Sequence, residues 1–175
     1  MAATPALHGN HAAVHVSLKI CANSEIRTWI DDLMFGNDRV QLRRFFTDTW
    51  HKARNDQQLD PLEEVISGII LQHPEYHKML EAGEDVLDRD FQPEDGESNP
   101  FLHLGMHIGL QEQISTNRPS DITALYQQLV IKTGDAHEAE HQMMECLGRM
   151  LWDAQRAGRM PDEKAYLECI KSLIR

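Results

Sequence analysis

Apolar side chains recur every three or four residues through most of the chain after residue 34, which is the spacing of an amphipathic α-helix. A clear example follows Asn37, a residue type that caps helix N-termini. The buried face predicted for this helix comprises Leu42, Phe45, Phe46, Thr49 and Trp50. No segment has the strict apolar–polar alternation of a half-buried strand. The pattern therefore predicts helices only.

Capping residues and prolines indicate where further helices begin. Asp60–Glu63 contains a cap residue, a proline at the first helical position and a glutamate placed to complete a capping box. Asn99–Pro100 repeats the order of cap and proline, and Ser120 and Asp135 are cap candidates for two later helices. We predict an all-α fold, a single bundle-like domain of six or seven helices over residues 34–175.

Residues 1–33 differ from the rest because no helical stripe is sustained there. Met34 is a candidate alternative start, and we expect residues 1–33 to be a poorly ordered N-terminal extension. His11 and His15 are four residues apart in this extension. No amphipathic helix surrounds them, and we assign them no ligand role.

Composition and charge narrow the range of partners. The formal net charge is −11, which disfavours binding to a nucleic-acid backbone. No apolar run approaches the roughly 18 residues of a membrane span, and no secretory signal is evident. The three cysteines, Cys21, Cys146 and Cys169, form no paired motif and suggest reduced thiols. We expect a cytoplasmic protein without nucleic-acid or membrane partners, and a protein partner or a homo-oligomer stays open.

Two of the predicted helices each carry a pair of histidines four residues apart. The segment NPFLHLGMHIGL contains His103 and His107, and the segment DAHEAEHQMMECL contains His137 and His141. Four residues is slightly more than one helical turn, so the two rings of a pair project from one face. Two such helices packed side by side would present four imidazoles to one point. We predict a metal site there.

Chance does not account for this spacing. The histidines after residue 34 would form roughly 0.3 such pairs at random, whereas the sequence contains three, the third being His73 with His77. His73 directly precedes Pro74 and can be explained as a helix-boundary residue. The roles of His73 and His77 are therefore left open.

The donor atoms indicate which ion would bind. Imidazole nitrogen suits zinc, iron, copper and nickel, and carboxylates often complete such sites in helical bundles. Glu145, one turn beyond His141, is the predicted auxiliary carboxylate, with Glu63 and Glu112 as weaker candidates; Glu63 is already explained by its capping box. We predict a divalent iron, zinc or manganese ion. A coordination position left open to water would permit oxidation or hydrolysis, and no catalytic residue, substrate or organic cofactor can be assigned.

Two features of the helix that carries His137 and His141 do not add to the predicted ligands. The run HEAEH at 137–141 superficially resembles the zinc-protease motif HExxH, but Glu138 is better understood as the capping partner of Asp135. Cys146 lies about 180° around the same helix from His137, so it is not expected to be a ligand.

A second interpretation gives the histidines a structural role in which hydrogen bonds satisfy them. The chain would then be a non-catalytic interaction or regulatory module. Basic residues of the helix predicted around residues 39–54, or an exposed apolar patch, would meet a protein partner. Measurement of the metal content separates the two interpretations.

Six runs of sequence carry a resemblance to a known family. They are VQLRRFFTDTW from Val40, HPEYH from His73, LDRDF from Leu87, NPFLHLGMH from Asn99, MECLGRMLW from Met144 and DAQRAG from Asp153. With these runs the chain resembles, over residues 34–175, an uncharacterised bacterial family catalogued as domain of unknown function 1841. The resemblance implies a small cytosolic domain. It supplies no activity and no ligand set, so the metal prediction is based on spacing alone.

Overall fold

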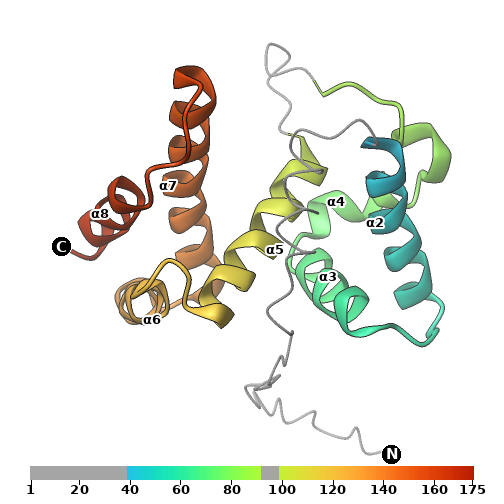
Figure 1. Ribbon diagram of the computed structural model, residues 1–175. Helices are drawn as coiled ribbons and strands as arrows, with labels where there is room; N and C mark the ends of the chain where they lie inside the picture. Colours follow the sequence, from blue (N-terminus) through green and yellow to red (C-terminus); the bar gives the residue numbers. More distant parts are fainter. Residues whose placement is uncertain (1–38, 92–98) are drawn as a thin grey trace, which may run out of the picture.

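The computed structural model describes residues 39–91 and 99–175 and is built from α-helices (Figure 1). No strand occurs in these two ranges, which confirms the predicted all-α, bundle-like fold with its six or seven helices. Residues 1–33 and Asn37, the predicted cap of the first helix, lie outside the described ranges. The elements are α2 (Arg39–Arg54), α3 (Pro61–Leu71), α4 (Pro74–Leu80), the short 3₁₀ helix η1 (Gly83–Val86), α5 (Pro100–Thr116), α6 (Ile122–Thr133), α7 (Ala136–Ala157) and α8 (Glu163–Ile174).

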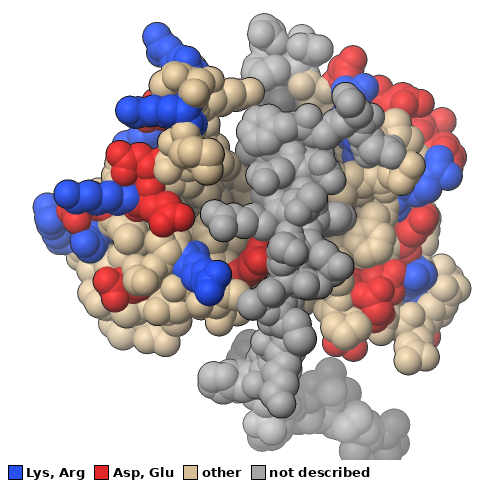
Figure 2. Space-filling view, in the orientation of Figure 1, with Lys and Arg blue, Asp and Glu red and all other residues tan. Residues whose placement is uncertain are grey.

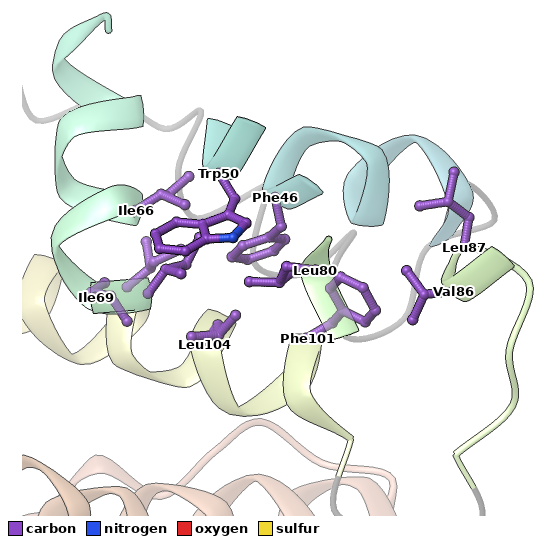
Figure 3. Close-up of a cluster of buried hydrophobic side chains, with 11 residues drawn as sticks. Phe46, Trp50, Ile66, Ile69, Leu80, Val86, Leu87, Phe101 and Leu104 are labelled. Atoms are coloured by element: carbon purple, nitrogen blue, oxygen red, sulfur yellow. The ribbon is translucent and has the colours of Figure 1, made fainter. Parts of the chain in front are cut away.

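A first hydrophobic core lies among α2, α3, α4, η1 and α5 (Figure 3). The predicted inward stripe of α2 forms one wall, with Phe46 fully buried and Trp50 nearly so. Phe101 and Leu104 of α5 lie on the opposite side of the cluster in this view. The buried members are Phe46, Trp50, Ile66, Ile69, Ile70, Leu80, Val86, Leu87, Phe101, Leu104 and Ile108.

A second hydrophobic core lies among α6, α7, α8 and the later turns of α5. In Figure 1 these helices form the gold, orange and red group, and α5 runs between it and the blue and green group of α2 to α4. The buried members are Leu110, Ile122, Leu125, Leu129, Ala139, Met143, Met144, Cys146, Leu147, Tyr166 and Ile170.

Helix α5 belongs to both cores. It packs against α3 on one side and against α6 and α7 on the other. Leu104 and Ile108 contribute to the first core and Leu110 to the second. This dual role explains why apolar residues surround α5 on all sides in the sequence, and it confirms that this helix is buried on several faces.

The predicted caps are largely confirmed. Asp60 and Glu63 form the reciprocal capping box of α3, and the Asn99 side chain accepts from the backbone of the first turn of α5. Asp135 caps α7 by accepting from the Glu138 backbone N–H. The prediction for Ser120 is wrong: α6 begins after Asp121, whose left-handed backbone leaves no side-chain cap.

Helix α7 packs on two sides, and this corrects the prediction for the cysteines. Cys146 faces α8 and forms a disulfide with Cys169, although 23 positions separate the two residues in sequence. The spacing forms no local motif and so suggests free thiols, but the packing of α7 against α8 brings the Cα atoms to 5.8 Å. Trp152, near the C-terminal end of α7, is 57% exposed beside the guanidinium of Arg156.

The basic residues of α2 are engaged within the chain. Arg43 is buried and donates to the backbone carbonyls of Leu87 and Arg89. The others form ion pairs, and the pairs are Arg39 with Asp90, Arg44 with Glu84, Lys52 with Glu63 and Arg54 with Glu81. These pairings explain why several cations lie on one helix of an acidic chain.

The surface carries charges of both signs. On the face shown in Figure 2, Lys and Arg side chains alternate with Asp and Glu side chains over both groups of helices. Within residues 39–91 and 99–175, no helix combines the length and the apolar character that crossing a membrane requires.

Candidate metal centre

Five imidazole rings converge between the two hydrophobic cores. His73 precedes α4, His103 and His107 belong to α5, and His137 and His141 belong to α7. The centroids of neighbouring rings in this group are separated by 4.2 Å, for His137 with His141, to 5.5 Å, for His73 with His141. We call these five rings the histidine cluster. A concentration of this kind in a protein interior needs an explanation, because each ring has two polar nitrogens.

Local helix geometry positions four of the five rings. The pair on α5 and the pair on α7 each span about one turn, so each pair projects from one face. Since α5 and α7 pack together, the two pairs meet. The Nε2 atoms of His103 and His141 are 3.2 Å apart. The structure thus brings together the four histidines that the sequence singled out.

His73 is the fifth ring, and the sequence left its role open. It lies at the break between α3 and α4, where the following Pro74 excludes helical geometry and the backbone takes φ −121° and ψ 66°. Its side chain makes no capping hydrogen bond. Instead, its Nε2 lies 3.0 Å from Nε2 of His107. The ring is 1% exposed and stacks on Tyr76.

The partner of His73 in the HPEYH run points elsewhere. Nε2 of His77 donates to the backbone carbonyl of Ile70, and its ring packs against Trp50 with 4.3 Å between centroids. The third histidine pair is therefore divided between the cluster and the first core.

The first donor group comprises four nitrogens. One ligand atom each from His73, His103, His107 and His141 can be chosen so that all lie within 4.8 Å of one another. Two ligands of a tetrahedral zinc ion lie about 3.4 Å apart when the bonds are about 2.1 Å long. The two closest contacts in the group, 3.0 Å and 3.2 Å, are near that spacing.

The second donor group comprises His107, His137 and Glu140, again with ligand atoms within 4.8 Å. Oε2 of Glu140 lies 2.8 Å from Nδ1 of His107. The Glu140 side chain is almost fully buried. Burial raises the pKa of Tyr126 to about 12, and the negative charge of Glu140 acts in the same direction. Nδ1 of His137 is buried and has no hydrogen-bond partner among the described residues.

The structure places the predicted carboxylates outside these groups. Glu145 is exposed and belongs to neither donor group. Glu63 holds the α3 capping box, as its sequence context indicated, and also pairs with Lys52. Glu112 is likewise in neither group. Glu140 is the carboxylate of the cluster. Its spacing of three residues from His137 was the available signal, because that spacing also shares a helix face.

Burial and mutual proximity keep two of the rings, those of His103 and His141, uncharged. Burial lowers the pKa of His103 to about 4, and the neighbouring His107, His73 and His141 add to this effect. Burial likewise lowers the pKa of His141, aided by His137. These two rings are therefore neutral at pH 7, which is the form that binds metal ions.

The fold and this cluster define an all-α protein with a histidine-rich polar centre between two hydrophobic cores. The chain belongs to the family described as domain of unknown function (DUF1841), whose family model matches residues 38–172. The match confirms the resemblance carried by the six sequence runs. Comparison with curated proteins finds no match, and neither does comparison with solved structures.

Proposed function

We propose that this protein binds a divalent transition-metal ion through nitrogens of His73, His103, His107 and His141. The proposal differs from the sequence prediction in three respects. His73 joins the ligands of this ion, and both His137 and Glu145 are removed from them. Glu140 supports His107 through its hydrogen bond, in the way that carboxylates orient metal-binding histidines.

The observation that carries the proposal is the contact between His73 and His107. Glu140 accepts from Nδ1 of His107, and Glu75 accepts from Nδ1 of His73 at 2.9 Å, so both rings carry a proton on Nδ1. In a neutral ring, Nε2 then holds a bare lone pair. The two Nε2 atoms nevertheless face each other at 3.0 Å. Two lone pairs at this distance repel each other, and a cation between them relieves the repulsion.

A proton is a poorer candidate for that cation than a metal ion. Bridging the two rings by a proton would make one of them an imidazolium inside the cluster. Burial lowers the pKa of His73, and His107 and His137 oppose its protonation further, against the favourable hydrogen bond to Glu75. A metal ion also engages the facing Nε2 atoms of His103 and His141, which a single proton does not.

The donor set narrows the choice of ion. Four imidazole nitrogens favour zinc, iron, copper or nickel over manganese, which prefers oxygen ligands. Of the ions predicted from the sequence, zinc and iron therefore fit best. An ion with an open position would supply Lewis-acid or redox chemistry, and hydrolysis and oxidation are the reaction classes that follow. The chain itself contributes the rings, their orientation by Glu75 and Glu140, and exclusion of water by burial.

The alternative of an interaction module has less support. Of its two proposed contact surfaces, an exposed apolar patch and the basic helix α2, the second is weakened, because the cations of that helix pair with acidic residues of the same chain or are buried. Purely structural histidines would also leave the lone pairs of His73 and His107 opposed.

Metal analysis of the full chain, purified without a histidine tag, tests the proposal. After chelator treatment the protein is reloaded separately with zinc, iron(II) or copper(II), dialysed and analysed by mass spectrometry. We expect at least one ion per chain. The double variant His103→Ala with His141→Ala should lose more than 90% of the bound ion, whereas His51→Ala, an exposed histidine of α2, should retain it. A wild-type chain that retains none of the three ions would refute the proposal.

A further inference from the structure

The His107 ring faces two donor groups with its two nitrogens. Nε2 points to His73 in the first group, at 3.0 Å, and Nδ1 points to Glu140 in the second, at 2.8 Å. The ring is fully buried, so neither nitrogen reaches solvent. An imidazole with both nitrogens directed at separate clusters of donors has the geometry of a bridge between two ions.

The second group also contains an unsatisfied polar atom. Nδ1 of His137 is buried without a hydrogen-bond partner among the described residues. A buried nitrogen of this kind destabilises the fold unless something binds it. The His137 ring lies parallel to that of His107, with centroids 5.2 Å apart. Its position beside Glu140 and His107 supplies the third donor of a compact group.

We propose that the centre holds two ions, with the His107 ring as the bridge. This inference depends on the proposed function, because it requires the first ion at the four-histidine group. The second ion would be held by Nδ1 of His107, by His137 and by Glu140. Binding there releases the Nδ1 proton of His107 to solvent, and Glu140, which accepts that proton's hydrogen bond in the ion-free protein, becomes a ligand.

The two positions differ in the chemistry that they would support. Four histidines complete a tetrahedral shell around a first ion, which is typical of structural zinc. Two histidines and one carboxylate leave coordination positions open, which is typical of catalytic zinc and of non-haem iron. Small ligands that bind through oxygen, such as water or a carboxylate, are therefore assigned to the second ion. Tyr126, whose pKa is raised in part by the nearby charge of Glu140, would orient that ligand.

Zinc stoichiometry under saturating conditions tests the inference. By equilibrium dialysis the wild-type chain should bind two zinc ions and Glu140→Gln one, because glutamine keeps the shape of the side chain but is a poor ligand. Glu145→Gln is the matched control on the same helix and should bind two. His137→Ala should also bind one, which provides a second variant if Glu140→Gln does not fold by circular dichroism.

The outcomes separate this inference from the proposed function. A wild-type chain without zinc or any other ion would refute the proposed function. A wild-type chain with one zinc ion, and one also in Glu140→Gln, would refute the second ion and leave the first. In that case Glu140 is only an orienting residue, and its loss should weaken affinity by about 10- to 100-fold without changing the stoichiometry.

Copper(II) loading gives a spectroscopic test of the bridge. A bridging imidazolate couples the spins of two copper(II) ions. As bound copper rises from one to two equivalents per chain, the low-temperature electron paramagnetic resonance intensity per copper should therefore decrease in the wild type. In Glu140→Gln it should stay proportional to the bound copper. A proportional signal in the wild type at two bound equivalents would refute the shared ring.

Discussion

The histidine cluster shows how burial controls the chemistry of single residues. A ring exposed to water protonates near pH 6.5, whereas burial and neighbouring rings hold His103 neutral down to about pH 4. Burial lowers the pKa values of His73 and His141 as well. Each of these rings consequently keeps a lone pair for a metal ion, and each becomes sensitive to acid when no ion is bound.

The metal-free protein should lose stability as the pH falls from about 6.5 to about 4. In this window the histidines of the unfolded chain bind protons, whereas the buried rings of the folded chain stay neutral. Protonation therefore favours unfolding. After a discount for partial exposure, we expect a loss on the order of 2 kcal/mol, measured by urea denaturation in chelator. The variant His103→Ala with His141→Ala should show a shallower decline. A free energy of unfolding that increases as the pH falls from 6.5 to about 4 would contradict the conclusion that the buried rings are neutral.

Arg43 is a basic residue of α2 that lies in the interior and not on the surface. It is 4% exposed, donates to two backbone carbonyls and lies over the rings of Phe91 and Phe101. Replacement by alanine leaves both carbonyls without their donor.

We expect Arg43→Ala to reduce the free energy of unfolding by about 2 to 4 kcal/mol. Arg44→Ala is the matched control. Its side chain is half exposed and pairs with the exposed Glu84, so its loss should cost less than about 1 kcal/mol. Equal effects of the two substitutions in chemical denaturation would show that the buried contacts of Arg43 contribute little.

At the scale of elements, the break between α3 and α4 positions the proposed ligand His73, which lies on the face of neither helix. α3 ends at Leu71, and α4 begins at Pro74. The proline keeps His73 out of helical geometry, and the ring turns toward α5 instead of following the face of α3. A helix continuing through this point would point His73 in another direction.

Pro74→Ala should therefore weaken metal binding more than it weakens folding. Alanine permits His73 to become helical, so the ring is less well ordered for the ion. We expect a loss of zinc affinity on the order of 10-fold in competition titrations with a chromophoric chelator. Pro61→Ala, at the corresponding position of α3, is the control and should leave affinity unchanged. Equal affinities for Pro74→Ala and the wild type would contradict this role.

At the scale of the whole molecule, two hydrophobic cores share α5, and the polar cluster lies where they meet. The disulfide between Cys146 and Cys169 belongs to the second core and lies on the side of α7 away from the histidines. A cross-link there restrains the unfolded chain without touching the proposed ligands.

The double variant Cys146→Ala with Cys169→Ala should lower the free energy of unfolding by about 3 kcal/mol, as expected for a loop of this length. Its metal content should equal that of the wild type, because neither sulfur belongs to a donor group. Loss of the ion together with the disulfide would show that α8 supports the centre. Metal analysis of the oxidised and the reduced protein distinguishes the two results.

The helices and the two histidine pairs were predictable because they depend on short spacing. Caps such as Asp60 and Asn99 act on backbone groups within one turn, and a separation of four residues places two rings on one face. The carboxylate prediction named Glu145 and missed Glu140. Spacing does not distinguish the two, because each lies within one turn of a histidine of the cluster. Only the packing partner of each face separates a buried carboxylate from an exposed one.

The sequence by itself determined the all-α class, the helix boundaries at strong caps and the presence of paired imidazoles, since these follow from interactions between near neighbours. Tertiary structure alone decided that His73 joins them, that Glu140 faces His107, and that Cys146 meets Cys169. Each of these contacts joins different helices or the ends of different helices. Their geometry is set by how α5, α7 and α8 pack, a property that no local pattern encodes.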